Sequence, residues 1–338
     1  MTGKIDQLEA IIPPQGLEKH RFSREITLKI RELQQRNNWY NFFAIGLDWL
    51  IISLAIVLNY FIPTVWMYLI SLVIIGSRMR GLDIMMHESS HRMLFKNRKL
   101  NKWVACFFAA YPIMISHKAY CKSHMDHHRY LWSEVDPDKQ RYRIVGLDKP
   151  PKNRMQFFIH HCLKPLFLVH VPNYLIGMIK VTAYAKEEPR FEQIIRTLYW
   201  VVIIISSIIF GFWQELILFW FIPFLTTFQV LKYWAEMAEH AGLESEHEIF
   251  ASRNSFGNWF ERMLIHPHRN SYHLVHHLFP AVPHYNIKKV HLILLEDSEY
   301  QKAHHCTGFF LASAPGFSSV IDDIQGRIPF WNKKFKEK

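Results

Sequence analysis

Residues 37–77 read NNWYNFFAIGLDWLIISLAIVLNYFIPTVWMYLISLVIIGS, and this stretch decides the fold because it contains no lysine or arginine. A second stretch without a basic residue runs from Thr197 to Leu231. Each is about twice as long as the roughly 17 to 25 residues with which an α-helix crosses the hydrocarbon core of a bilayer. Polar and helix-breaking residues interrupt the two stretches near Asn59–Pro63 and Gly211–Glu215. The sequence therefore predicts two transmembrane helical hairpins, with four spans in all.

The basic residues predict the orientation of these hairpins. All 40 lysines and arginines lie outside the two stretches, so the positive-inside rule places both termini and the central segment on the cytoplasmic side. We expect an all-α integral membrane protein of a bacterial inner membrane or the endoplasmic reticulum, with a helical cap on its cytoplasmic face. Its expected segments are a cytoplasmic N-terminal segment at 1–38, a hairpin at 39–80, cap at 81–196, a second hairpin at 197–232 and cap with a C-terminal tail at 233–338. A soluble protein with two buried helical pairs is the alternative.

Two shorter apolar stretches and one acidic residue need separate interpretation. Trp103–Ser116 is too short to span a membrane, and Met155–Lys180 is interrupted by histidine, lysine and proline, so both are predicted to be helices lying at the membrane interface. Asp48 lies within the first hairpin, where an acid is costly and commonly functional. We expect Asp48 to lie near the interface, with its side chain reaching water.

Nine of the 21 histidines are concentrated at four places in the chain. They form HESSH at His87–His91, HMDHH at His124–His128, HLVHH at His273–His277, and the single His240. Residues three and four apart share one face of a helix, so each group directs its imidazoles the same way. Because a buried imidazole needs partners for its ring nitrogens, core packing explains such groups poorly. They predict a metal site close above the membrane, where the apolar helices end.

The number of histidines predicts how many metal ions there are. Neutral imidazole suits iron, zinc, copper or nickel, so the ligand type leaves the metal open. A single zinc ion takes four ligands, usually three of them from the protein when the site is catalytic, and nine histidines are too many for one ion. Two ions with four or five ligands each would use the whole set.

The order HxxxH, HxxHH, HxxHH around two membrane hairpins resembles the membrane-bound fatty acid desaturase and hydroxylase superfamily. The resemblance covers roughly Asn38 to His291 and includes the turn Asp136-Pro137-Asp138 and the run Leu278-Phe279-Pro280. It implies a di-iron site, with two iron ions held by all nine histidines, namely His87, His91, His124, His127, His128, His240, His273, His276 and His277.

The same resemblance draws attention to Glu236. In the stearoyl-CoA type of desaturase, an asparagine four residues before the isolated histidine holds a metal through water, and this chain has Glu236 at that position. Glu236 is therefore a candidate ligand, direct or through water, with an orienting role as the alternative. Four further residues are candidates for supporting the ligands: Glu88, Asp126, Asn270 and Tyr272.

The resemblance also implies a reaction and its partners. Members use O2 as co-substrate and two electrons to introduce a double bond into an acyl chain, so a fatty acid desaturase is expected, with a lipid or small-molecule hydroxylase as the alternative. The chain has no haem-binding cytochrome domain, flavin motif or iron–sulfur cysteine set, so a separate electron donor, ferredoxin or cytochrome b5, is expected. The net charge of +11 comes from scattered basic residues, which favours membrane lipids or acidic partners over nucleic acid.

Two other classes of protein remain to be weighed. HESSH also fits the HExxH pattern of zinc metalloproteases, in which His87 and His91 bind zinc and Glu88 is the base, but this leaves seven clustered histidines unexplained. A metal transporter would need polar groups within its spans, which are almost wholly apolar. Metal content separates the three classes: two irons per chain are expected for the desaturase or hydroxylase, one zinc for the protease, and exchangeable metal for the transporter.

Overall fold

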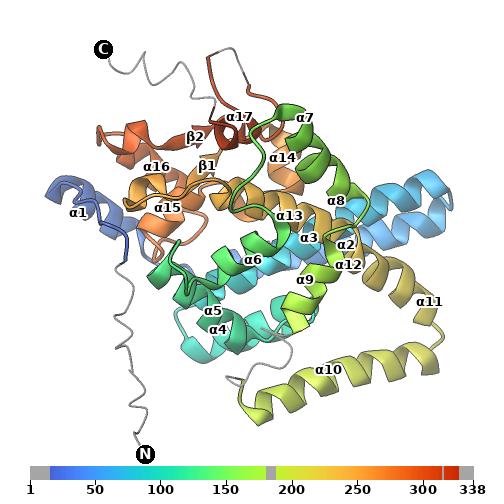
Figure 1. Ribbon diagram of the computed structural model, residues 1–338. Coiled ribbons are helices and arrows are strands. Elements are labelled where there is room, and N and C mark those ends of the chain that lie inside the picture. Colours follow the sequence, from blue (N-terminus) through green and yellow to red (C-terminus); the bar gives the residue numbers. More distant parts are fainter. Residues whose placement is uncertain (1–15, 180–187, 314–315, 327–338) are drawn as a thin grey trace, which may run out of the picture.

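The computed structural model describes residues 16–179, 188–313 and 316–326, so parts of both predicted cytoplasmic ends lie outside the described residues. The chain is mostly helical (Figure 1). Its strands, β1 (Arg253–Ser255) and β2 (His304–Cys306), form one short parallel pair with Asn254 opposite His305. The predicted helical class is confirmed, apart from this small addition.

The first predicted hairpin is present as two antiparallel helices, α2 (Tyr40–Phe61) and α3 (Val65–Ser90). The turn falls at residues 62–64, at the end of the predicted range, where Thr64 caps α3 by accepting a hydrogen bond from the backbone N–H of Met67 at 3.2 Å. Glycine allows the two helices to approach closely, since a Cβ at Gly81 would lie 2.7 Å from a carboxylate oxygen of Asp48.

Asp48 does not reach water, so the expectation made for it was wrong. Its side chain is fully buried, where it lies 3.0 Å from Arg78 Nη1 and 2.6 Å from His268 Nε2. A buried carboxylate is tolerated when it is paired and hydrogen-bonded, and these two partners come from elements distant in sequence. Asp48 therefore joins α2 to α3 and to the cap.

The second hairpin consists of α10 (Arg190–Ile209) and a long helical run from Trp213 to His240. The run is made of α11 (Trp213–Leu216), η4 (Ile217–Phe221), α12 (Ile222–Leu225) and α13 (Thr227–His240). Gly211, with a φ of 78°, makes the turn between the arms. The helices of this hairpin begin before the predicted residue 197 and end after the predicted residue 232. The prediction was based on the absence of basic residues, whereas helical hydrogen bonding continues into the charged segments on either side.

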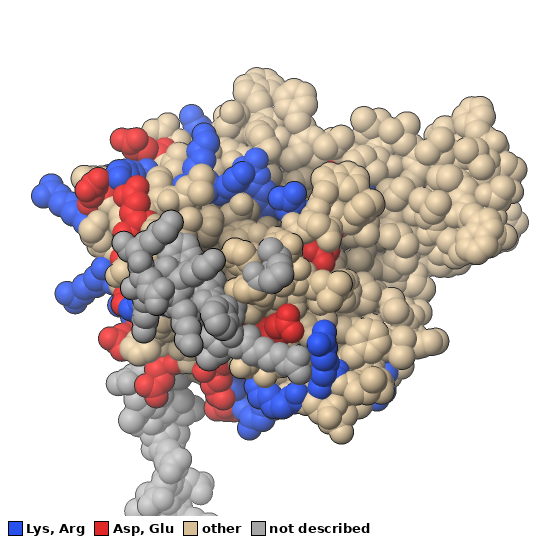
Figure 2. Space-filling view, turned by 90° about the horizontal axis from the view of Figure 1, so that it is seen from above, with Lys and Arg blue, Asp and Glu red and all other residues tan. Residues whose placement is uncertain are grey.

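Among the described residues, three helices are long and apolar enough to cross a membrane: Tyr40–Phe61, Arg190–Ile209 and Trp213–His240. Helix α3 was predicted to be a fourth span. It has the length, but its second half carries Arg78, Arg80 and Asp83 and is buried in the cap. Charged side chains gather on one part of the surface, while the lobe at the upper right of Figure 2 shows none. An integral membrane protein is expected to have such a division.

The two stretches predicted to lie at the interface are helical. The first includes the end of α4 (Arg98–Ala105) and the π-helical turn η1 (Cys106–Ala110). The second contains α7 (Arg154–Phe157), η2 (Phe158–Leu163), α8 (Lys164–Leu166) and α9 (Val171–Met178), and its last predicted residue, Lys180, lies outside the described residues. Their placement at a membrane surface stays a prediction.

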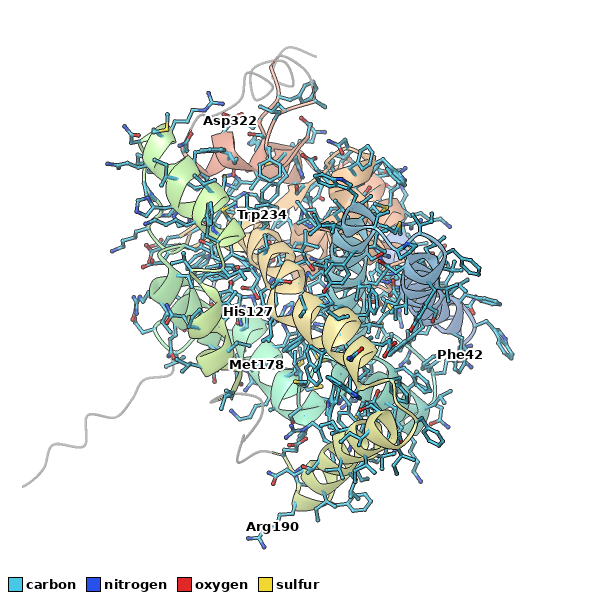
Figure 3. All side chains as sticks on the ribbon, turned by 90° about the vertical axis from the view of Figure 1, so that its right-hand side faces the viewer. Phe42, His127, Met178, Arg190, Trp234 and Asp322 are labelled. Carbon is cyan, nitrogen blue, oxygen red and sulfur yellow. The ribbon has the colours of Figure 1, made fainter. Side chains whose placement is uncertain are left out.

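The cap is built around the C-terminal halves of α3 and α13. Each helix continues into the cap from an apolar segment that precedes it in the chain. A Cβ at Gly76 would lie 2.2 Å from Thr227 Oγ1, so this glycine lets the two helices pack closely. The other elements of the cap are α1 (Arg24–Leu33), α5 (His117–Tyr130), α6 (Pro137–Val145), η5 (Glu248–Phe250), α14 (Trp259–Leu264), η6 (Pro267–Arg269), α15 (His273–Leu278), α16 (Ile287–Leu294), η7 (Tyr300–Lys302) and α17 (Val320–Ile324). In Figure 3, His127 lies near the middle of the molecule, between Asp322 of α17 and Arg190 of α10.

Candidate metal centre

The nine histidines meet at the centre of the cap in two adjacent clusters. The first, the five-histidine cluster, contains His87, His91, His124, His128 and His276. The second, the four-histidine cluster, contains His127, His240, His273 and His277. Within each, the candidate ligand atoms all lie within 4.8 Å of one another. The clusters adjoin where the rings of His128 and His277 stack, with centroids 4.3 Å apart.

The prediction that each group directs its imidazoles the same way is wrong for the two HxxHH groups, whose rings divide between the clusters. Residues four apart stay together: His124 and His128 lie in the five-histidine cluster, and His273 and His277 lie in the other. The ring between each pair, at the i+3 position, joins the opposite cluster. Helices α5 and α15 therefore each supply both clusters, α3 supplies only the first, and the last residue of α13 supplies only the second.

The distances between ring nitrogens fit metal ligation. In the five-histidine cluster, His124 Nε2 lies 2.8 Å from His91 Nε2 and 3.1 Å from His128 Nε2. In the four-histidine cluster, His240 Nε2 lies 2.9 Å from His273 Nε2 and 3.0 Å from His277 Nε2. Two imidazole nitrogens bound at about 2.1 Å to one ion and at about 90° to each other lie about 3.0 Å apart. The donor set therefore fits two metal ions.

Two rings of the four-histidine cluster are oriented through Nδ1. His127 Nδ1 donates to Asp136 Oδ1 at 2.9 Å, and His240 Nδ1 donates to the carbonyl oxygen of Ala251 at 2.8 Å. Because a carboxylate and a carbonyl can only accept, the proton must be on Nδ1, which leaves the lone pair of Nε2 directed into the cluster. Asp136 is itself held in place, because it caps α6 and accepts from the backbone N–H of Trp132 at 2.9 Å.

The electrostatic environment keeps most of these rings neutral, as metal ligands must be. Burial lowers the pKa of His124, His128 and His277 well below its usual value, and neighbouring imidazoles lower it further. His127 differs: burial lowers its pKa, but the carboxylates of Asp138 and Asp136 outweigh burial and raise it.

Comparison with known proteins decides the family. The model of the family "Fatty acid desaturase" matches residues 63–309, a range that contains all nine histidines. The chain belongs to the fatty acid desaturase family.

Relatives of this desaturase chain carry different substrate names. It is 34% identical over 324 residues to the dihydrorhizobitoxine desaturase of Bradyrhizobium elkanii, covering 92% of this chain and 91% of the relative. It is 27% identical over 232 residues to the human sphingolipid delta(4)-desaturase/C4-monooxygenase DES2, covering 67% and 65%. It is also 22% identical over 270 residues to the sn-1 oleoyl-lipid 12-desaturase of Arthrospira platensis, covering 73% and 72%.

The four predicted supporting residues occupy different surroundings in this desaturase. Glu88 has one oxygen 3.8 Å from His87 Nδ1 and accepts from the backbone N–H of His284 with the other. Asn270 donates to Glu239 Oε1 at 2.7 Å, and that oxygen lies 3.9 Å from His273 Nδ1. Both residues lie where they can support a ligand.

The other two predicted supporting residues face elsewhere. Asp126 pairs with Lys122 one turn away at 2.9 Å, on the outer side of α5. Tyr272 packs its ring against Phe256 and His291, with centroids 4.9 and 5.5 Å away. Closeness to a histidine in the sequence did not distinguish these residues from Glu88 and Asn270, because residues that are near one another in the chain point in different directions.

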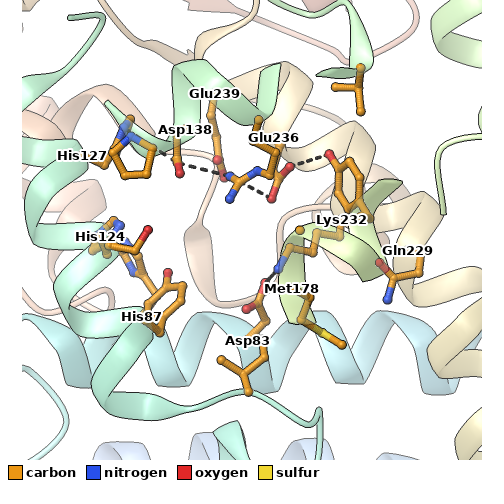
Figure 4. A pocket seen from close by; sticks show the side chains of 18 of the residues that line it. Asp83, His87, His124, His127, Asp138, Met178, Gln229, Lys232, Glu236 and Glu239 are labelled. Atoms are coloured by element: carbon orange, nitrogen blue, oxygen red, sulfur yellow. Dashed lines mark hydrogen bonds and ion pairs between the residues drawn. The ribbon is translucent and has the colours of Figure 1, made fainter. Parts of the chain in front are cut away.

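Glu236 does not lie in either histidine cluster of the described structure. Its carboxylate accepts a hydrogen bond from Tyr174 at 2.5 Å and lies 3.2 Å from Arg141 Nη2 (Figure 4). Besides Glu88, three carboxylates that the sequence did not assign to the site lie close to a ring nitrogen of a clustered histidine: Asp136 and Asp138, at 2.9 and 3.7 Å from His127 Nδ1, and Glu239, at 3.9 Å from His273 Nδ1. Asp136 had one signal in the sequence, an aspartate directly before a proline that starts a helix.

Proposed function

We propose that this protein is a di-iron desaturase that uses O2 and two electrons to introduce a double bond into its substrate. The reaction takes a –CH2–CH2– unit, O2, two electrons and two protons to –CH=CH– and two waters. The observation that supports it most directly is the convergence of nine imidazoles into two clusters, in which eight of the rings have Nε2 spacings of 2.8–3.2 Å.

In this proposal, each cluster holds one iron ion. Iron supplies the activation of O2 and the removal of hydrogen from an unactivated carbon. The protein holds the imidazoles neutral and oriented, through Asp136 and the Ala251 carbonyl, and buries the site away from bulk water. Glu236 is left out of the ligand set because its carboxylate is engaged by Arg141 and Tyr174.

The proposal includes a membrane arrangement. We place α2, the apolar first half of α3, the apolar part of α10 from Thr197, and residues 213–232 of the run that follows it in a bacterial inner membrane or the endoplasmic reticulum as four spans, with both termini and the histidines on the cytoplasmic side. The support is the concentration of charge on the cap (Figure 2) and the exposed apolar side chains of α2 and α10. A separate protein, ferredoxin or cytochrome b5, would dock on the cap and deliver the electrons.

Hydroxylation is the second candidate. One relative is named both a desaturase and a C4-monooxygenase, and both outcomes begin with removal of one hydrogen from carbon. The histidine clusters do not distinguish the two reactions.

Metal analysis and product analysis test these proposals in sequence. Protein purified in detergent from iron-sufficient cells should contain about two irons per chain, and cells expressing it should contain a product with a new double bond. One zinc without iron would refute the di-iron proposal, whereas a hydroxylated product would replace desaturation by the second candidate. Turnover with NAD(P)H and O2 alone would refute the requirement for a separate electron donor.

A further inference from the structure

A cavity of about 360 Å³ lies against the histidine clusters (Figure 4). Its walls come mainly from α3, α5, α6, α9 and α13, and they include His87, His124 and His127. In Figure 4 these three histidines lie at the left of the cavity, opposite Met178 and Gln229. Most of the wall is apolar, so the cavity can hold the apolar part of a substrate beside the clusters.

The charged side chains of the wall already pair with one another. At distances of 2.5–3.5 Å, the pairs are Arg80 with Asp83 and Glu239, Lys232 with Asp83, and Arg141 with Asp138 and Glu236. Because each of these charges has a partner of opposite sign, the wall does not offer a free charge to a ligand. The cavity therefore selects what enters it by shape.

The cavity opens to the surface between α6 and α9. Most of the described residues that line it are buried or half-buried. The exposed ones are Gln140 and Ile144 of α6 and Asn173 of α9, and Ile144 is 61% exposed. Gln140 and Ile144 are four residues apart, so they lie along one edge of their helix. The opening is thus bordered by one edge of each of the two helices.

Glu236 of α13 joins the two sides of this opening. Its carboxylate accepts a hydrogen bond from Tyr174 of α9 at 2.5 Å and lies 3.2 Å from Nη2 of Arg141 of α6. Its backbone carbonyl oxygen also accepts from the hydroxyl of Tyr142 of α6 at 2.7 Å. Glu236 and both tyrosines are buried. Because buried hydrogen bonds attach both helices to the same turn of α13, the opening has a defined width.

Gly177 leaves free space at the opening. Asn173, Tyr174, Gly177 and Met178 all line the cavity, so they share the face of α9 that is directed toward it. On this face, Gly177 follows the exposed Asn173 by one helical turn. A Cβ at Gly177 would have no neighbouring group within 4 Å. A larger side chain at this position would therefore extend into the opening without a clash.

We propose that the substrate reaches the histidine clusters through the opening between α6 and α9, and that Gly177 determines how wide a substrate can pass. Gly177 is then a specificity-determining residue of this desaturase, although it lies outside both clusters. This inference rests on the proposed function, because it concerns the substrate on which the desaturation acts.

Side chains of increasing size at position 177 test the inference. Gly177→Ala, Gly177→Leu and Gly177→Phe are each expressed as the full-length chain, and the product with a new double bond is measured in the cells. The amount of product should fall stepwise with side-chain size. We expect a loss of at least about tenfold for Gly177→Phe, since even one methylene in a substrate pocket changes discrimination by about tenfold or more.

Two further measurements separate a blocked opening from a damaged protein. The iron content of each purified variant should equal that of the unmodified protein, because position 177 is in neither cluster. Thermal unfolding in detergent should occur at the same temperature or higher, because glycine is a poor helix former and each replacement favours the helix.

Two variants serve as matched controls. Gly46→Phe makes the same change at an exposed glycine of α2, where a Cβ would also have no neighbouring group within 4 Å. Ile176→Phe enlarges the neighbouring residue of α9, whose side chain is 50% exposed and does not line the cavity. Both variants should form product within about twofold of the unmodified protein, as is usual for surface substitutions.

Undiminished product from Gly177→Phe would overturn the inference, as would an equal loss of product from Gly46→Phe or Ile176→Phe. Loss of iron from Gly177→Phe would also overturn it, because the new side chain would then have disturbed the clusters. An unmodified protein without iron or product would refute the proposed function, and the inference with it. That outcome is distinct from the others, because it appears before position 177 is changed.

Discussion

The two histidine clusters differ in how their rings are held. The four-histidine cluster has fewer rings, but Asp136 and the Ala251 carbonyl orient two of them. In the five-histidine cluster, both ring nitrogens of His87 are buried and lack a hydrogen-bond partner among the described residues, and the ring packs against the imidazoles of His124 and His276, with centroids 4.4 and 4.3 Å away. The smaller cluster is preorganised by its surroundings, whereas the larger one depends on the number of its ligands.

Support for the four-histidine cluster extends to the end of α13. Arg253 is fully buried and donates to the carbonyl oxygens of Met237 and Ala241, on either side of His240. These carbonyls lie at a helix C-terminus, where a cation is favourable. Asp323 balances the guanidinium at 2.8 Å. An ion pair in the cap thus fixes the last turn of a helix that begins in the apolar part.

The largest expected effect is from removal of a ligand. His277→Ala leaves the four-histidine cluster with three imidazoles, whereas His91→Ala leaves the other cluster with four. Both should lower activity by more than about 100-fold, beyond the effect of losing an outer partner. Iron analysis should show a greater loss of metal from His277→Ala. His160→Ala, which alters an exposed histidine outside both clusters, is the control. Full iron content in His277→Ala would contradict the assignment.

Removal of an orienting group should have the next largest effect. Asp136→Asn takes the charge from the partner of His127 Nδ1, and outer partners of this kind typically contribute 10- to 100-fold to metal affinity, so we expect a loss of about that size. Competition with a chelator would measure it. Iron binding as tight as in the unmodified protein would show that the hydrogen bond at 2.9 Å does not contribute.

Loss of the buried ion pair should reduce stability more than chemistry. Burial raises the pKa of Asp323, but Arg253 and His304 outweigh it and hold the pKa below its usual range. The pair therefore contributes stability at neutral pH, and this contribution is lost as the pH falls below about 4 toward the folded-state pKa. Asp323→Asn should cost about 3 kcal/mol at pH 7, measured by thermal unfolding in detergent, and less in acid. If Asp323→Asn lowered the free energy of unfolding equally at pH 7 and in acid, the result would argue against the ion pair.

The smallest expected effect is that of Asp126→Asn. Asp126 lies within HMDHH, but its carboxylate pairs with Lys122 near the surface, where such pairs contribute about 0–1 kcal/mol. Metal affinity and activity should therefore stay within about twofold of the unmodified protein. Because Asp126 and Asp136 are both aspartates near the same histidines, a large effect from Asp126→Asn would remove the distinction that we draw between them.

The sequence by itself determined the two apolar hairpins, the nine histidines and the number of ions that they could hold. These follow from local properties: the length of an apolar run, and the rule that residues three and four apart share a helix face. The same rule predicted that each group of histidines acts together. Only the structure showed that the i+3 ring of each HxxHH group joins the opposite cluster, because that depends on where the neighbouring helices lie.

Tertiary structure also decided the surroundings of single acids. Glu236 pairs with Arg141 of α6, Asp48 pairs with Arg78 and His268, and neither partner could be read from the adjacent sequence. The cavity beside the clusters arises in the same way, from faces of α3, α6 and α13 that are distant along the chain. A buried charge is stable only where packing brings a partner to it, and the sequence near that charge does not specify which helix will do so.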